Sequence, residues 1–431
     1  MTVKARPTRP GSRAVRTATA FAGGLALVAT AACSVSTPQT GLAQPVPVEL
    51  TADLPGQLTI GVEVTLTSAP GEGAEWRDAA EGAVVAARRF ALGGTKITLV
   101  AVNDKGTSEG ATAAVKALAG QDVAAIIVAT DGDHVAAGLA EAAADQIPVL
   151  MPYDLGSGGV TGQVWSTGPG RQATDTRLVA TMADRHLDAP LLVDAGGGPV
   201  TGLTPREQQT YAAGGDAAAL ATGVARRQRQ LDTAVDSIVV SGAPELQAAV
   251  VAALQGSSID VPILLTPQAL SPAFPAALTQ AGGSLSGQLS SAGLDEGDAT
   301  ALEATDAGRS LAAYFSGLQL AADDPATKDL AGDRPFADVA AAADVSSHDA
   351  VVAVVRAAVA AKSTQPAQVA QALPGLRLGS ADGVAGPPLD FSSTQAVGED
   401  AVVPLASTAV SPGVRPPSDA PTLFWFDSTH S

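Results

Sequence analysis

The sequence predicts an α/β protein of two lobes, in which each lobe is a parallel sheet flanked by helices and a cleft lies between the lobes. Strand-like and helix-like segments alternate from residue 58 onward, and the alternation begins again after Thr167. A chain of 431 residues is also too long for one ordinary domain. Such alternation produces right-handed βαβ units, whose ligands bind beyond the carboxyl ends of the strands.

The first unit begins where a proline-rich stretch gives way to β-branched residues. Segment 58–66 predicts a strand, and 75–90 predicts a helix because its apolar residues recur at helical spacing. Segment 124–130 is a nearly continuous apolar run, as in a strand buried on both faces. The remaining predicted elements of this unit are strands at 96–103 and 147–151 and helices at 108–119, capped by Ser108, and at 134–144.

The second unit repeats the pattern, and the C-terminal part is more helical. Its predicted elements are helix 171–185, strands 190–195, 237–241 and 262–266, and helix 244–254. The C-terminal part adds helices at 305–320, 347–362 and 366–372 and a last strand at 421–426. Segment 323–343 is acidic and alanine-rich, which is typical of an insertion. The composition, with 46% hydrophobic and 16% charged residues, is sufficient for a large hydrophobic core. Because only 3% of the residues are aromatic, this core is expected to consist mainly of Ala, Val and Leu.

The first 32 residues have the layout of a secretory signal peptide. Five Lys and Arg residues precede the apolar run 18–30, which is too short to span a bilayer. Ala31 and Ala32 then lead into Cys33, the only cysteine of the chain. The run Thr30-Ala31-Ala32-Cys33 resembles the lipidation site of bacterial lipoproteins, with Thr30 where Leu or Val is usual. The alternative is a free thiol in an ordinary signal peptide.

A lipidated Cys33 places the protein outside the cytoplasm, on the outer face of the cell membrane, which it touches only through the anchor. Residues 33–57 carry four prolines among small polar residues and predict a tether.

Without residues 1–32 the chain has 43 acidic against 20 basic residues, a formal charge of −23. Such a surface repels nucleic acid and anionic lipid, so no nucleic-acid partner is expected.

Several segments, in their order and spacing, resemble one family over residues 58–426. They are 60–90, 122–152 (DVAAIIVATDGDHVAAGLAEAAADQIPVLMP), 236–242 (DSIVVSG), 348–373 and 383–391 (GVAGPPLDF). The chain is similar to the type I periplasmic binding proteins, specifically the branched-chain amino-acid (Leu/Ile/Val) binding proteins of ABC importers. The resemblance implies a solute-binding protein that presents a small ligand to an ABC permease. It also implies a first lobe of 58–166 plus 294–391 and a second of 167–293 plus 392–427, which close on the ligand by a hinge motion.

The resemblance implies that ligand contacts in the first lobe come from two loops. Asp131, Gly132 and Asp133 follow the third strand, where family members offer hydroxyls and amides to a ligand carboxylate. The two aspartates either cap the next helix or bind an amine or hydroxyls. Tyr153 and Ser157 lie in the second loop, where Ser157 would donate to a ligand and Tyr153 would stack on it or stand exposed.

The remaining implied contacts depart from the family pattern. Gln268 falls where the family has an acidic residue for the ligand amine, and Gly197 offers only backbone amides. Trp76 lies next to the family's cleft-facing aromatic position. Because both ends of the zwitterion site are altered, the expected ligand is a polar neutral or cationic molecule: amino-acid-like, an amine or a polyol. Asp131, Asp133, Tyr153 and Gln268 are expected to hold it.

Other function classes find weaker support in the sequence. Gly106–Gly110 matches G-x-S-x-G around Ser108, which keeps a serine hydrolase as a distant alternative. The four histidines form no close ligand pair, and Gly196–Gly198 does not complete G-x-G-x-x-G, so no metal, cofactor or catalytic residue is predicted. The nearer alternative is a sensory or envelope-interaction lipoprotein that uses the same fold without a ligand.

Overall fold

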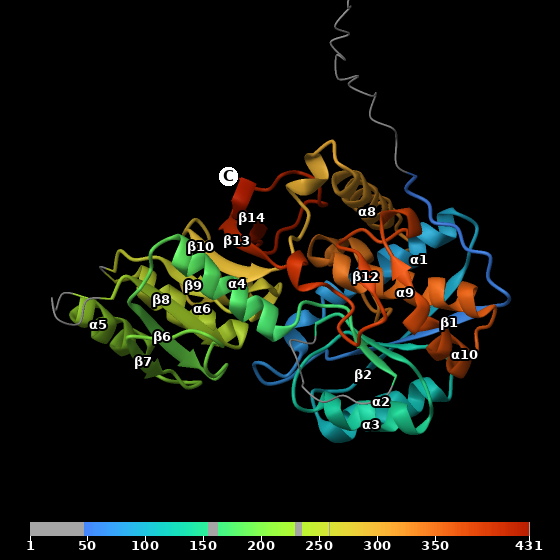
Figure 1. Cartoon of the computed structure of the whole chain (residues 1–431), viewed down its shortest axis with the longest axis horizontal. Helices are drawn as coiled ribbons and strands as arrows, with labels where there is room; N and C mark the ends of the chain where they lie inside the picture. Colours follow the sequence, from blue (N-terminus) through green and yellow to red (C-terminus); the bar gives the residue numbers. More distant parts are fainter. Residues whose placement is uncertain (1–46, 154–162, 229–234, 258, 431) are drawn as a thin grey trace, which may run out of the picture. The chain divides into compact units, whose positions relative to one another are not determined.

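The computed structural model describes residues 47–153, 163–228, 235–257 and 259–430 (Figure 1). The predicted signal peptide, Cys33, most of the tether and Ser157 lie outside these residues. Among the described residues, the strands form a five-stranded sheet, a seven-stranded sheet and one two-stranded pair.

The five-stranded sheet is parallel and has the order β2-β1-β3-β4-β5. Its strands are β1 (Leu58–Val64), β2 (Ile97–Asn103), β3 (Ile126–Val128), β4 (Val149–Met151) and β5 (Val164–Ser166). Alternate residues of β1 pack against α1 (Gly82–Leu92) and α9 (Val345–Ala361). Helices α2 (Ser108–Ala119) and α3 (Val135–Ala144) cover the other face (Figure 1). Burial on both faces explains why these strands read as apolar runs.

The seven-stranded sheet has the order β14-β13-β10-β9-β8-β6-β7. Five strands are parallel: β6 (Pro190–Ala195), β7 (Glu207–Thr210), β8 (Ser237–Gly242), β9 (Ile263–Leu265) and β10 (Leu289–Gly293). Strands β13 (Val403–Thr408) and β14 (Phe424–Asp427) extend it antiparallel. One face packs on α4 (Arg171–Asp184), and the other on α5 (Ala217–Gln228), α6 (Pro244–Gln255) and α7 (Ala273–Gln280).

The chain passes between the two sheets at three places. It does so from β5 to α4, from β10 to α8 (Asp306–Ala322), and from β12 to β13. Helix α8 packs on α1, helix α10 (Pro366–Ala372) packs on α9, and β11 (Arg377–Leu378) pairs with β12 (Leu389–Asp390). The predicted two-lobed fold class, with parallel sheets flanked by helices, is confirmed. The exact lobe boundaries stay a prediction.

The predicted helix 75–90 is wrong in its first turns. Residues Ala74–Trp76 and Ala79–Glu81 form two separate 3-10 turns, and α1 begins only at Gly82. The Ala79 carbonyl accepts hydrogen bonds from the Asp344 amide (3.1 Å) and the Ser347 hydroxyl (3.1 Å) at the start of α9. A contact from a distant part of the chain therefore shapes this segment.

The predicted cap of α2 is also wrong by one residue. Thr107, not Ser108, is the N-cap: its backbone is extended and its hydroxyl accepts the Gly110 amide at 3.1 Å. Ser108 is an exposed residue in the first turn of the helix. Threonine and serine are both good N-caps, so the choice depends on where the preceding loop ends.

This assignment gives a first prediction. Thr107→Ala is expected to lower the free energy of unfolding by about 1 kcal/mol, because the Gly110 amide loses its acceptor. Ser108→Ala is the matched control and should change stability by less than about 0.5 kcal/mol, as for an exposed site without a special contact. Urea denaturation of both variants checks this, and a larger loss for Ser108→Ala would contradict the assignment.

Candidate ligand cavity

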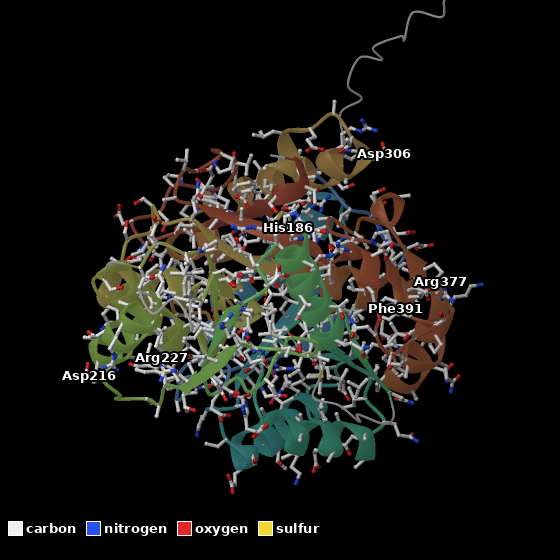
Figure 2. The ribbon with its side chains drawn as sticks, turned by 60° about the vertical axis from the view of Figure 1, so that its left-hand side comes forward. His186, Asp216, Arg227, Asp306, Arg377 and Phe391 are labelled. Carbon is white, nitrogen blue, oxygen red and sulfur yellow. The ribbon has the colours of Figure 1, made fainter. Side chains whose placement is uncertain are left out.

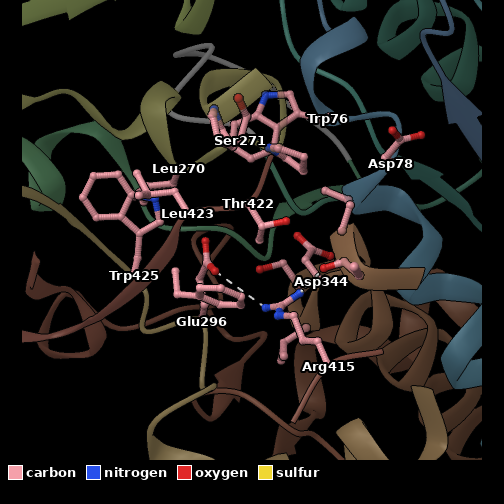
Figure 3. Close-up of a pocket in the computed structure, with 18 of the residues that line it drawn as sticks. Trp76, Asp78, Leu270, Ser271, Glu296, Asp344, Arg415, Thr422, Leu423 and Trp425 are labelled. Carbon is pink, nitrogen blue, oxygen red and sulfur yellow. Dashed lines mark hydrogen bonds and ion pairs between the residues drawn. The ribbon is translucent and has the colours of Figure 1, made fainter. Parts of the chain in front are cut away.

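A cavity of about 250 Å³ lies where loops from both sheets and the crossing segments meet (Figure 3). Four stretches supply most of its lining: residues 76–79 before α1, 267–276 after β9, 338–346 before α9, and 415–425 before β14. Residues 152–153 after β4, Pro169 after β5 and residues 294–296 after β10 complete it. The lining therefore combines strand-end loops of both sheets, which is where parallel sheets bind ligands.

An aromatic pair forms one wall of the cavity. Trp76 and Tyr153 stack with ring centroids 4.6 Å apart and an interplanar angle of 7°. Trp76 is held by the turn at Gly73, whose φ is 97° and whose missing Cβ would lie 1.8 Å from the Thr130 hydroxyl oxygen. Only glycine fits such a position. The structure thus brings together two residues that the sequence analysis expected at the ligand site.

Three buried polar atoms at this wall lack a hydrogen-bond partner among the described residues. They are the Trp76 indole nitrogen Nε1, the Tyr153 hydroxyl oxygen and the Ser271 hydroxyl oxygen, in residues that are 9%, 3% and 1% exposed. Figure 3 shows Trp76 and Ser271 toward the same end of the cavity. Buried polar groups are normally hydrogen-bonded, so unpaired ones beside a cavity indicate a bound molecule.

The carboxyl groups of Asp344 and Glu296 lie toward the end of the cavity opposite Trp76 and Ser271 (Figure 3). Asp344 is the N-cap of α9, and its Oδ1 accepts the Ser347 amide (2.9 Å) and hydroxyl (2.7 Å). Burial raises the pKa of Asp344 to about 6, although these hydrogen bonds oppose the shift. Burial likewise raises the pKa of Glu296 to about 8, against the attraction of Arg415.

Arg415 is the one basic side chain among the described residues that line the cavity, and Asp298 neutralises it. Its Nε and Nη2 donate to the two carboxylate oxygens of Asp298 at 2.7 Å each. Its Nη1 donates to the carbonyls of Ala341 (3.0 Å) and Ala343 (2.9 Å). The Glu296 carboxylate lies farther from Arg415, with 3.6 Å between Glu296 Oε2 and Arg415 Nη2. The carboxyl groups of the cavity therefore outweigh its positive charge.

The aspartates of the loop after β3 lie elsewhere. None of Asp131, Gly132 and Asp133 is among the residues that line the cavity, and Asp133 is exposed. Asp131 accepts the Gly132 amide at 2.8 Å. Neither aspartate caps α3, whose N-cap is His134. The buried His134 ring instead ties this loop to Asp104 (2.9 Å).

The residues expected from the second lobe also lie outside the lining. The Gly197 amide donates to the Ser241 carbonyl at 3.3 Å, which holds two strand-end loops together. Gln268 lies between the lining residues Pro267 and Leu270, and its buried Oε1 has no partner among the described residues. A contact between Gln268 and a ligand stays a prediction, as does any role of Ser157.

The sequence analysis did not single out Asp344, Glu296, Ser271 or Arg415. Asp344 carried a usable signal, because an aspartate three residues before Ser347 is a helix N-cap pattern. The other three lie in irregular segments after β9, after β10 and before β14, where no local pattern marks them.

The comparisons with known proteins agree with this architecture. A family model described as periplasmic binding protein matches residues 57–403, so the chain belongs to the periplasmic binding protein family, as the sequence motifs indicated. No curated protein sequence matches the chain. Its family and its structural relatives are solute-binding proteins, and an extracytoplasmic location follows from the family.

Three solved structures show the same fold at low sequence identity. The branched-chain amino acid transporter substrate binding protein LivJ from Streptococcus pneumoniae, in complex with isoleucine, has a TM-score of 0.58 at 18% identity, over 86% of this chain and 99% of its own. The leucine binding protein LivK from Thermotoga maritima has a TM-score of 0.57 at 13% identity, over 87% and 100%. An extracellular ligand-binding receptor from Rhodopseudomonas palustris has a TM-score of 0.61 at 15% identity, over 81% and 97%.

Two statements hold for the described residues, 47–153, 163–228, 235–257 and 259–430. Within them, none of the helices has the length and apolar character needed to cross a bilayer. No group of three or more His, Cys, Asp or Glu side chains within the same residues is placed to hold a metal ion.

Proposed function

We propose that this chain is a solute-binding lipoprotein that captures a small polar ligand in the cavity and presents it to an ABC importer. The ligand would be amino-acid-like, an amine or a polyol, and the two lobes would close on it by a hinge motion. The protein would catalyse no reaction, and labelling of Ser108 by a serine-reactive probe would contradict that part.

One observation carries the proposal. The cavity is lined from both sheets, and it contains buried polar atoms, Trp76 Nε1 and the Ser271 hydroxyl oxygen, that no described protein group satisfies. A contact between two lobes with no ligand would either give such atoms hydrogen-bond partners or use apolar side chains in their place. The reason is that an unsatisfied buried donor lowers the free energy of unfolding by about 1–3 kcal/mol. These atoms are not accessible in the empty cavity, so a ligand with hydrogen-bonding groups would become their partner as the lobes close on it.

The membrane anchor is a separate part of the proposal. Cys33 would carry the lipid after removal of residues 1–32, and residues 33–57 would hold the binding unit away from the membrane. Growth of expressing cells with a labelled fatty acid tests this. Label on the wild-type protein and none on Cys33→Ser is the expected result, and equal labelling would contradict lipidation at this residue.

Ligand capture itself is tested by thermal unfolding of the purified protein with a panel of small metabolites. A ligand at one hundred times its Kd should stabilise the native state by about 2.7 kcal/mol, because it binds the folded form alone. Trp76→Ala should abolish the rise in Tm for that ligand by removing one wall of the cavity. If no compound raises Tm, and native mass spectrometry finds no co-purified molecule, the chain is an envelope-interaction lipoprotein without a small ligand.

A further inference from the structure

We propose that the ligand is an organic cation, a protonated amine on an apolar or aromatic body, with its ammonium group between Asp344 and Glu296. This inference rests on the proposed function and names the ligand class of the same cavity. Asp344 lies at the start of α9, and Glu296 lies in the crossing segment after β10. An ammonium group held by both would therefore link two parts of the chain that border different sheets.

The charge balance of the cavity favours a cation. Arg415 is fully engaged by Asp298 and two carbonyls, so its charge is not available to a ligand anion. Asp78, another lining residue, pairs with Arg334 at 3.0 Å. Asp344 and Glu296 lack such a close ion pair, the nearest being the 3.6 Å contact of Glu296 with Arg415. In their ionised forms these two carboxyl groups repel a ligand carboxylate, whereas an ammonium group neutralises them.

The side chains that form the walls of the cavity favour a ligand whose remaining part, apart from the ammonium group, is apolar or aromatic. The stacked Trp76 and Tyr153 rings form one side, and Figure 3 shows Leu270, Leu423 and Trp425 on another. Indole and phenol rings bury a large apolar surface, and they suit the body of the ligand and not its ammonium group, which would lie at the other end of the cavity. The unpaired Trp76 Nε1 and Ser271 hydroxyl oxygen lie toward the end opposite the carboxyl groups, and they are the independent sign that a molecule belongs in this cavity.

The proposal requires a particular pH dependence. Asp344 faces Tyr153, Ser347 and Arg415, and Glu296 faces Arg415, Asp298, Asp295 and Asp344. With pKa values raised to about 6 and about 8, these carboxyls are partly protonated in the empty cavity near neutral pH. A cation binds their ionised forms and releases protons. Affinity for an amine should therefore rise as pH increases from 5 to 8.5.

The test compares amines with matched analogues by thermal shift and calorimetry on the purified protein. The panel contains alkyl-, arylethyl- and indolylethylamines, each beside the carboxylate and the alcohol of the same carbon skeleton. The expected result is stabilisation by at least one amine and none by its two analogues. The double variant Asp344→Asn, Glu296→Gln should weaken binding of that amine at least about tenfold, because its ammonium loses two buried charged partners.

Asp216→Asn is the matched control. Asp216 also accepts a helix-start amide, that of Ala219 at 2.9 Å, but it is exposed (Figure 2) and is not among the residues that line the cavity. Asparagine caps a helix as well as aspartate does, so both variants should fold, and their unliganded Tm values verify this. Asp216→Asn should bind the amine as the wild type does.

The other outcomes separate this inference from the proposed function. Tighter binding of a carboxylate or an alcohol than of its amine would overturn the cation assignment and leave solute binding intact. Undiminished amine binding by the double variant, or affinity that falls with rising pH, would overturn the assigned position of the ammonium. Stabilisation by no compound in any of the three classes would overturn the cation assignment, and it would remove the proposed function as well if native mass spectrometry also finds no co-purified molecule.

Discussion

Arg415→Ala is expected to lower the free energy of unfolding by about 3–5 kcal/mol, the usual cost of breaking a buried ion pair from one side. The guanidinium is 7% exposed and makes a two-pronged contact with Asp298, which is 1% exposed. Without Arg415 the Asp298 carboxylate stays buried and unneutralised, and the carbonyls of Ala341 and Ala343 lose their donor. Chemical denaturation measures the loss directly.

The same substitution should also weaken ligand binding in the cavity. Arg415 ties the segment before β14 to the turns before α9, and this segment supplies Thr422 and Leu423 to the cavity lining and leads into Trp425 of β14. Freed from that contact, the segment can move away from the ligand. We therefore expect Arg415→Ala to reduce the ligand-induced rise in Tm as well as the Tm itself.

Two further variants make this prediction decisive. Arg309→Ala removes an ion pair with Asp306, which is 83% exposed on the first turn of α8 (Figure 2), and should change stability by less than about 1 kcal/mol. The double variant Arg415→Met, Asp298→Leu removes both charges of the 2.7 Å pair and should recover part of the lost stability, because the Asp298 carboxylate is no longer left buried without a partner. A double variant less stable than Arg415→Ala would show that packing, and not the ion pair, dominates.

The sequence predicts the sheets well where each strand is buried on both faces. Segment 124–130 is an apolar run because helices cover both sides of its sheet, and such a run is visible without a structure, as are the β-branched residues of segment 58–66. Strands β5, β7, β10 and β13 were not predicted: β7, Glu207–Thr210, is a polar edge strand that pairs only with β6, and β10, Leu289–Gly293, is an inner strand made mainly of small residues (LSSAG). Helix α7 was missed because Pro275 lies inside it, and helix α5 because Gly223 interrupts a weakly apolar segment.

The cavity residues were predictable only in part, because some of them come from segments that lie far apart in the sequence. Trp76 and Tyr153 follow the ends of strands β1 and β4, so the rule for parallel sheets places them near a ligand. Asp344 and Arg415 come from segments that no regular pattern connects to those strands. Their meeting depends on the ion pair of Arg415 with Asp298, a tertiary contact between residues 117 positions apart.

Gly82→Ala is expected to lower the free energy of unfolding by about 3 kcal/mol, the upper part of the range for forcing an extra carbon into a packed site. Gly82 begins α1, where this helix meets the start of α9. A Cβ at this position would lie 1.9 Å from the Asp344 carbonyl oxygen and 2.5 Å from the Ser347 hydroxyl oxygen. The first atom belongs to the backbone, so the clash cannot be relieved by a side-chain rotation.

The displacement should also impair ligand binding, because the segment that must move carries the Asp344 carboxylate. The amide of Asp344 and the hydroxyl of Ser347 both donate to the Ala79 carbonyl, and a shift of α9 away from α1 breaks both hydrogen bonds. Thermal unfolding with and without the amine that stabilises the wild type should therefore show a lower Tm and a smaller ligand shift.

Gly223→Ala separates this effect from the general consequence of replacing a helical glycine. Gly223 lies within α5, and no atom lies within 4 Å of the position its Cβ would occupy. There alanine should raise stability by about 0.5–1 kcal/mol through its better helix propensity. Equal effects of the two substitutions would mean that α1 and α9 tolerate a wider spacing, and the close approach at Gly82 would then not determine where Asp344 stands in the cavity.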